Sequence, residues 1–245
     1  MFRNLKLKTK MLIVGSFLTV LPLVVFGAFV FNQNAKTVKV ATVESIRLAT
    51  TDLDHIAEGV YRMVETQNDV LLKAVRSYLN VARNTVANLG GISFARENVD
   101  WTAVNQYNQA ATQVQLPKML VGNTWFGKTS DLRSRVPVVD HVQELASGVT
   151  CTVFQRMNAT GDMLRIATNV INTDGSRAIG TFIPKTNPDG AENPVIAAVL
   201  RGQTFNGRAF VVNKWYLTAY EPIYAEDGSI VGVLYVGIPQ ESAQS

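Results

Sequence analysis

The chain has 245 residues, of which 47% are hydrophobic and 17% are charged, which excludes an intrinsically disordered chain. Its net charge of +4 is modest and no basic run follows the N-terminus, so we expect no nucleic-acid partner. Two histidines and one cysteine, Cys151, leave little for a metal site and exclude an internal disulfide. No Cys-x-x-Cys-His motif for covalent haem is present. We therefore expect neither a metal nor a cofactor.

The N-terminal residues predict a membrane anchor. Residues 1–10 form a basic segment, and residues 11–31 carry no charge over a length that spans a bilayer as a helix. The basic flank predicts a cytoplasmic N-terminus. The alternative is a cleaved signal peptide, which is disfavoured because its apolar core is usually only roughly 7–15 residues long. No small-x-small cleavage site follows closely.

Residues 35–90 predict one long helix. Ala35–Leu89 contains no proline, its apolar positions step by threes and fours, and it ends at Gly90-Gly91. Such a helix would be roughly 80 Å long at about 1.5 Å per residue. We expect one stripe to pack on a sheet and another to face a second copy, which predicts a homodimer. The alternative is a helical hairpin that turns near residues 66–69, although the periodicity continues through this point.

The middle of the chain predicts alternating short elements. Residues 92–99 are expected as a loop and Asp100–Thr112 as a helix with Asp100 as its N-cap. Gln113–Trp125 is expected as a strand, at a sheet edge because Pro117 interrupts it. The remaining expected elements are a loop at 126–137, a helix at Val138–Ala146, strands at Thr150–Met157 and Met163–Val170, an extended segment at Ala178–Ile183 and a helix at Pro194–Leu200.

Three strand-like runs near the C-terminus predict an antiparallel meander. They are Thr204–Val212, Trp215–Tyr224 and Ser229–Ile238, and each is rich in β-branched and aromatic residues. Asn213-Lys214 separates the first two runs, and residues 225–228, with Asp-Gly, separate the second and third. A long helix followed by such strands predicts an α+β fold in which the helix packs on an antiparallel sheet.

The same C-terminal stretch resembles a known family. The segments FNGRAFVVNKWYLTAYEPI and DGSIVGVLYVGIP, supported upstream by GNTWFGK and NPVIAAVLRGQTF, are similar to the single Cache domain of methyl-accepting chemotaxis proteins. The resemblance implies a PAS-like ligand-binding domain over residues 91–239, outside the inner membrane, in the periplasm or extracellular space. It implies that residues 240–245 lead toward a second membrane helix. It further implies that a HAMP relay and a coiled-coil domain follow, acting on a cytoplasmic kinase and its adaptor.

Strand alternation predicts which side chains line a ligand pocket. Tyr216, Thr218 and Tyr220 share one face of their strand, where hydroxyl groups on an apolar wall can hold a small polar ligand. The alternative is that both tyrosines are ordinary core residues. The resemblance places Trp125 near the pocket, as an aromatic lid or a core anchor.

Three arginines on predicted strands are candidates for binding a carboxylate. The planar guanidinium group of arginine pairs with a carboxylate through two hydrogen bonds. The resemblance favours this role, because the family includes sensors of small carboxylates. The alternative for each is exposure, or a pair with Glu221 or Asp140. The complete candidate set is Trp125, Arg156, Arg165, Arg208, Trp215, Tyr216, Thr218 and Tyr220.

Four functions remain open from the sequence. We expect a small-molecule sensor of a transmembrane chemoreceptor, and the same sensor attached to a histidine kinase or a nucleotide cyclase is the main alternative. A membrane-anchored enzyme is disfavoured because no paired-carboxylate, metal or Ser/His/Asp signature is seen. A purely structural dimerising stalk would show no stabilisation by a ligand.

Overall fold

The computed structural model describes residues 6–240, so parts of the basic segment 1–10 and most of the segment 240–245 lie outside the described residues. The chain comprises two units, Met1–Glu65 and Thr66–Ser245. A single helix, α1 (Leu7–Asn88), begins in the first unit and ends in the second. It is helical throughout residues 66–69, so the alternative of a helical hairpin is wrong.

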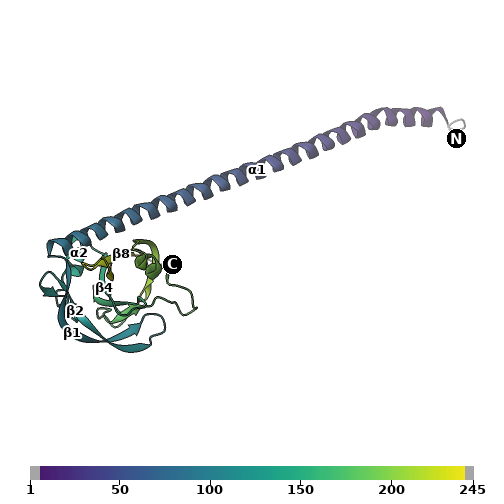
Figure 1. The fold of residues 1–245 in the computed structure, drawn as a ribbon. Coiled ribbons are helices and arrows are strands. Elements are labelled where there is room, and N and C mark those ends of the chain that lie inside the picture. The colour runs from purple at the N-terminus through teal and green to yellow at the C-terminus, as the bar shows by residue number, and fades with distance from the viewer. Residues whose placement is uncertain (1–5, 241–245) are drawn as a thin grey trace. The chain divides into compact units, whose positions relative to one another are not determined.

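The N-terminal unit is helical over its described residues (Figure 1). It contains a window with a mean hydropathy of 2.4 and no buried residue, which is long and apolar enough to cross a membrane. Pro22 lies inside this helix. A membrane helix tolerates a proline because neighbouring groups can satisfy the freed backbone carbonyl.

The end of α1 packs on the sheet of the C-terminal unit. Val75, Leu79 and Ala82 are buried at spacings of four and three, which is the periodicity of one apolar face of a helix. The helix ends at Asn88, just before Gly90-Gly91, where both glycines have positive φ and Gly91 N–H donates to the carbonyl of Val86. The predicted stop at these glycines is therefore confirmed.

Substitution of Leu79 by alanine tests this packing. Leu79 is 3% exposed, and a buried leucine cut to alanine costs about 2–5 kcal/mol of unfolding free energy. The matched control is Leu145→Ala, since Leu145 is 60% exposed and its loss should cost less than about 0.5 kcal/mol. Urea unfolding of the full chain in detergent, followed by tryptophan fluorescence, measures both. Equal effects of the two substitutions would contradict the packing.

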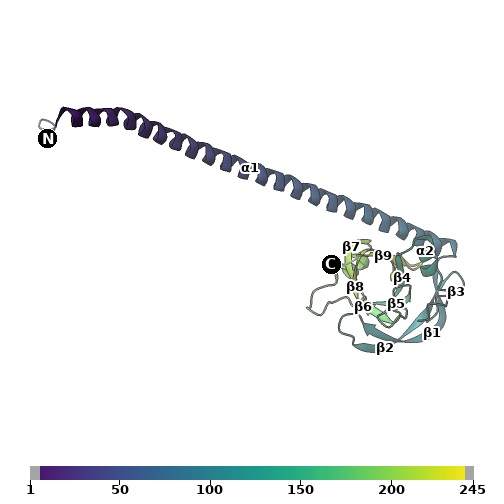
Figure 2. The same ribbon diagram turned by 180° about the vertical axis from the view of Figure 1, so that it is seen from behind.

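Within residues 66–240, the C-terminal unit is built on one sheet of nine strands in the order β3-β2-β1-β6-β5-β4-β9-β8-β7, and Figure 2 labels these strands. Neighbouring strands are antiparallel except β1 and β6, which pair in parallel over two residue pairs. The predicted α+β class is confirmed, with a mixed sheet in place of a purely antiparallel one. The elements are β1 (Ile92–Asn105), β2 (Ala111–Val121), β3 (Thr124–Trp125), α2 (Val139–Leu145), β4 (Thr150–Arg156), β5 (Met163–Thr168), β6 (Thr181–Ile183), α3 (Pro194–Leu200), β7 (Phe205–Val211), β8 (Lys214–Tyr224) and β9 (Ile230–Pro239).

The first hairpin of the sheet contradicts the prediction. The segment expected as a loop at 92–99 and a helix at Asp100–Thr112 is strand β1, a turn and the start of β2. Asp100 is not an N-cap, because it lies within β1 opposite Gln115. Trp101 and Ala103 are buried while Asp100 and Thr102 are exposed, a period-two pattern typical of a strand. The turn that follows is closed by Asn105 and Asn108, whose side-chain carbonyls accept backbone N–H groups two residues on.

The C-terminal meander is confirmed, with one shifted turn. Val211 pairs with Lys214, so the turn is Val212-Asn213 and not Asn213-Lys214. Val212 has φ +57°, which is unusual for a β-branched residue. The expected helices near 138–146 and 194–200, and the strands that became β4 and β5, are also confirmed.

The sheet carries two hydrophobic clusters on its opposite faces. Leu217 and Ala219 of β8 belong to the cluster that includes Val75 of α1. Tyr216 and Tyr220 of β8 belong to the other cluster, which includes residues of α3. The alternation predicted along β8 is therefore confirmed, and the second face, covered by α3, is the one that holds the candidate site.

Candidate ligand-binding site

Arg165 is the unusual residue of the face covered by α3. It lies on β5 and is 1% exposed, and its Cα pairs with that of Phe154 on β4. A register shift next to this pair inserts Ile166 as an extra residue, so Ile166 and Ala167 both join the cluster on the α1 side. Unbroken alternation along β5 predicts that Ala167 shares the face of Arg165, and the bulge makes that prediction wrong. The bulge interrupts the alternation of side chains along β5 after Arg165. Arg165 therefore lies among the aromatic side chains of the face covered by α3.

Aromatic rings surround the Arg165 guanidinium. Its Cζ lies 5.1 Å from the ring centre of Phe154, within the range of a cation–π contact. Tyr220 and Tyr235, paired across β8 and β9, have ring centres 4.7 Å apart and contact the same phenylalanine. Phe154, Tyr220 and Tyr235 are each at most 2% exposed, so the guanidinium is enclosed by an apolar and aromatic wall.

The Arg165 guanidinium has no carboxylate partner among the described residues. Its Nη1 donates to the hydroxyl of Thr181, and its Nε has no hydrogen-bond partner within residues 6–240. Burial lowers the pKa of this guanidinium, and nearby Tyr220, Tyr235 and Tyr216 oppose that shift. An arginine this deeply buried without a counter-ion is rare, because the desolvation of its charge is not offset by an ion pair.

The nearby tyrosines can donate hydrogen bonds to a ligand. Burial raises the pKa of Tyr216, Tyr220 and Tyr235, so their hydroxyl groups keep their protons at neutral pH. The hydroxyl of Tyr235 is 3.0 Å from Oγ1 of Thr150. The hydroxyls of Tyr216 and Tyr220 make no hydrogen bond within residues 6–240. The site therefore combines arginine N–H groups that have no partner within residues 6–240, the buried Nε among them, with two uncommitted phenols.

The other two candidate arginines lie away from Arg165. Arg156 donates to the backbone carbonyls of Asn158, Ala159 and Ile230, and so ties the β4–β5 turn to β9. Arg208 is exposed on β7 and stacks on Trp215, with its Cζ 4.4 Å from the ring centre.

Neither alternative pairing that the sequence suggested for these arginines is observed. Glu221 binds Arg83 of α1, and Asp140 binds Arg177.

The remaining candidates occupy three different environments. Trp215 is 46% exposed beside Arg208 and Phe210. Trp125 is partly buried on β3, under the ammonium group of Lys118. Thr218 is fully buried and donates to the carbonyl of Gly207 in the neighbouring strand. Of the candidate set, the structure brings together Arg165, Tyr216 and Tyr220.

Sequence reasoning missed Phe154, Thr181 and Tyr235. Tyr235 lies directly opposite Tyr220 in the β8–β9 hairpin, so counting residues back from the Asp-Gly turn could have found it. Phe154 and Thr181 approach Arg165 from β4 and β6, through strand pairings that no short-range pattern reveals.

The comparison with known families decides the identity of this fold. The sequence profile of the Cache 3/Cache 2 fusion domain matches residues 39–245. The chain belongs to this family. No curated protein matches the chain. The resemblance of the C-terminal segments to a Cache domain is confirmed, and the Cache domain is an extracytoplasmic sensor domain that binds small molecules.

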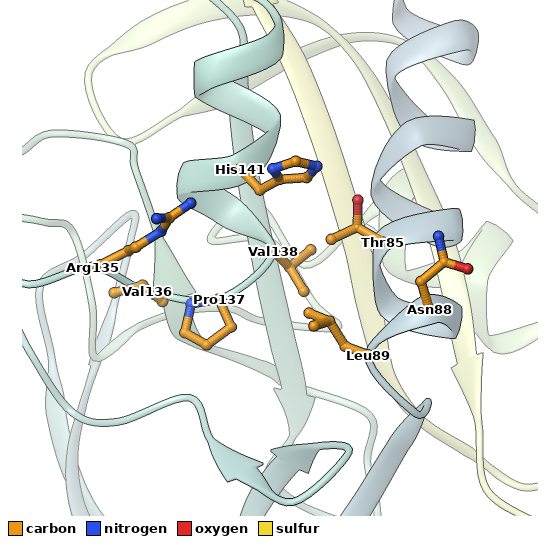
Figure 3. A pocket seen from close by; sticks show the side chains of 8 residues that line it. All are labelled: Thr85, Asn88, Leu89, Arg135, Val136, Pro137, Val138 and His141. Atoms are coloured by element: carbon orange, nitrogen blue, oxygen red, sulfur yellow. The ribbon is translucent and has the colours of Figure 1, made fainter.

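A separate cleft lies on the α1 side of the Cache domain (Figure 3). It has a volume of about 450 Å³. Its lining comes from the end of α1, the loop before α2 and α2 itself: Thr85, Asn88, Leu89, Arg135, Val136, Pro137, Val138 and His141. None of the residues around Arg165 lines this cleft, so the Cache domain has two candidate places for a ligand.

Proposed function

We propose that this Cache domain senses a short organic carboxylate, which binds to Arg165 as part of a transmembrane chemoreceptor. The observation that carries the proposal is the buried guanidinium without a counter-ion, whose Nε is unpaired within residues 6–240. A ligand carboxylate would offset its desolvation through a charge-assisted hydrogen bond. The hydroxyls of Tyr216 and Tyr220 would hold the second carboxylate oxygen or a polar substituent of the ligand.

The closed packing around Arg165 favours a small ligand. Phe154, Tyr220, Tyr235 and Arg165 are each nearly inaccessible, so little free volume surrounds the guanidinium. Ile196 and Val199 of α3 pack in the same cluster, so access requires α3 and its flanking loops to move. Such a requirement suits a sensor, because a ligand changes a conformational equilibrium only if it binds the two states with different affinity.

Strand β8 contacts both the candidate site and α1. Tyr220 lies among the aromatic side chains around Arg165, and the next residue, Glu221, accepts a hydrogen bond of 2.7 Å from Nε of Arg83 on α1. A second contact joins Nε of Arg76 to Asn206 of β7. A movement of β8 on ligand binding would therefore pull on α1, the helix whose N-terminal part is apolar enough to cross the membrane.

A thermal-shift screen tests the proposed function. The full chain in detergent is heated with acetate, propionate, pyruvate and succinate, and with the matching amides as neutral controls. At about 100 times Kd, binding adds roughly 2.7 kcal/mol of stability, which raises the unfolding midpoint by a few degrees. We expect at least one acid to stabilise the chain while its amide does not. Equal effects of acids and amides would contradict a carboxylate sensor.

The main alternative keeps the sensor and changes the output. A histidine kinase or a nucleotide cyclase can carry the same Cache domain, and the downstream sequence would distinguish them from a chemoreceptor.

A homodimer remains a proposal that rests on the exposed apolar residues of α1 such as Ile46, Leu53 and Val60. A non-enzymatic role is proposed because no group of metal ligands occurs within residues 6–240 and no nucleophile–base pair was identified in the sequence.

A further inference from the structure

The cleft beside α2 carries basic side chains and no acidic one in its lining. Arg135 and His141 provide the ionisable groups, Thr85 and Asn88 add polar tips, and Leu89, Val136, Pro137 and Val138 form apolar walls. Figure 3 shows His141 on α2 facing the end of α1, with Val138 and Leu89 between the two helices. Apolar walls with a few converging polar groups are typical of a small-molecule site.

Arg135 and His141 already converge on a carboxylate oxygen. Nη2 of Arg135 is 3.0 Å from Oε2 of Glu144, and Nδ1 of His141 is 3.9 Å from the same atom. All three side chains are about half exposed or more, so this pairing is worth only about 0–1 kcal/mol. A ligand carboxylate can therefore compete with Glu144 for the guanidinium, which has five N–H donors.

The loop that forms the cleft is held in a strained shape. Val138 has φ +67° and ψ −61°, and Val139 N–H donates to the carbonyl of Pro137 at 2.8 Å, which defines a classic γ-turn. A fully buried β-branched residue rarely adopts this conformation. The strain is maintained because Asp140 accepts from Val136 N–H at 2.7 Å and also binds the buried Arg177. Strain that the surroundings maintain in this way is concentrated at ligand sites.

We propose that this cleft is a second binding site, for an organic carboxylate that carries an apolar ring or branched chain. The carboxylate pairs with Arg135 and His141, and the apolar body lies against Leu89, Val136 and Val138. The volume of about 450 Å³ is within the roughly 300–1,000 Å³ of small-molecule pockets. The site is independent of Arg165, because no residue is shared between them.

The two histidines of the chain provide an internal control for this proposal. His141 lines the cleft, while His55 lies on α1 in the N-terminal unit. The full chain in detergent, isotope-labelled at its histidine rings, is titrated with benzoate and separately with benzamide and followed by NMR. Benzoate should shift the His141 ring signals in a saturable manner and leave those of His55 in place, and benzamide should shift neither. The His55→Gln variant assigns the two sets of signals.

Two substitutions with opposite effects complete the test. Arg135→Gln should weaken benzoate binding by about tenfold or more, the loss of one charge-assisted contact. Glu144→Gln removes the competing carboxylate and should tighten binding, a gain that a folding defect does not produce. The Arg165→Met variant should retain the full His141 response, which separates this site from the proposed sensor site. The proposal is overturned if benzoate moves neither histidine, moves both equally, or binds Arg135→Gln as well as the original chain.

Discussion

Replacement of Arg165 by methionine should strongly weaken carboxylate binding without destabilising the ligand-free protein. Truncation of one partner of a buried charge pair costs about 2–5 kcal/mol of binding free energy, so affinity should fall at least about thirtyfold. Arg165 has no carboxylate partner within residues 6–240 when the ligand is absent, so its removal relieves an uncompensated desolvation. We therefore expect an unfolding midpoint that is unchanged or higher, measured by the same thermal scan with and without the active carboxylate.

Two matched variants sharpen this result. Arg165→Lys keeps the positive charge but lacks the planar N–H fork, so it should bind more weakly than arginine and more tightly than methionine. Arg208→Met removes an exposed arginine that stacks on Trp215, and it should leave ligand binding unchanged. If Arg165→Met lowered the midpoint by several degrees and still responded to the carboxylate, the guanidinium would be a structural group and not the ligand's partner.

Removal of the Asp140 charge should be among the most destabilising single changes in the Cache domain. Asp140 binds Arg177 with both oxygens, and Arg177 also donates to the carbonyls of Thr168 and Ser134. The side chain of Arg177 is only 3% exposed and that of Asp140 is 14% exposed. Asp140→Asn leaves the Arg177 charge buried without a counter-ion, so we expect a loss of about 3–5 kcal/mol of unfolding free energy.

A double-mutant cycle in urea separates the ion pair from general damage. Arg177→Met alone and together with Asp140→Asn completes the cycle, and the double variant should be less destabilised than the sum of the single ones. The control is Glu192→Gln, which breaks the exposed pair with Lys185 in the same unit and should cost at most about 1 kcal/mol. The three tryptophans report on the outcome, since all lie in the C-terminal unit. An additive cycle, or a loss for Asp140→Asn no larger than for Glu192→Gln, would contradict the buried pair.

Elements with strong local patterns could be predicted from the sequence. The uncharged segment 11–31 and the three-four periodicity up to Gly90 specified the helix that became α1. Two turns and β-branched runs specified the meander β7–β9. The β1–β2 hairpin was missed because Asp100 before Trp101 fits a helix start as well as an exposed strand position. The short alternation from Val99 to Ala103 was the signal for a strand.

The choice among the three candidate arginines could not be made from the sequence. Each lies on a strand, and strand alternation gives only the face of each side chain. The three arginines differ in their long-range packing. Arg156 donates to backbone carbonyls of the β4–β5 turn and β9, and Arg208 stacks on Trp215. Arg165 is enclosed by aromatic rings from β4, β8 and β9. The bulge at Ile166 also breaks the alternation of side chains along β5, and no residue type in that strand predicts a bulge there.

The most direct test of the proposed sensor is a structure of the full chain with the carboxylate that stabilises it most. The proposal predicts a ligand oxygen at about 2.7–2.9 Å from Nε of Arg165, with the hydroxyl of Tyr216 or Tyr220 donating to the ligand. It also predicts a displacement of α3 relative to the ligand-free protein. A structure in which Nε of Arg165 remains without a partner while the carboxylate is bound elsewhere, for example beside Arg135, would contradict it.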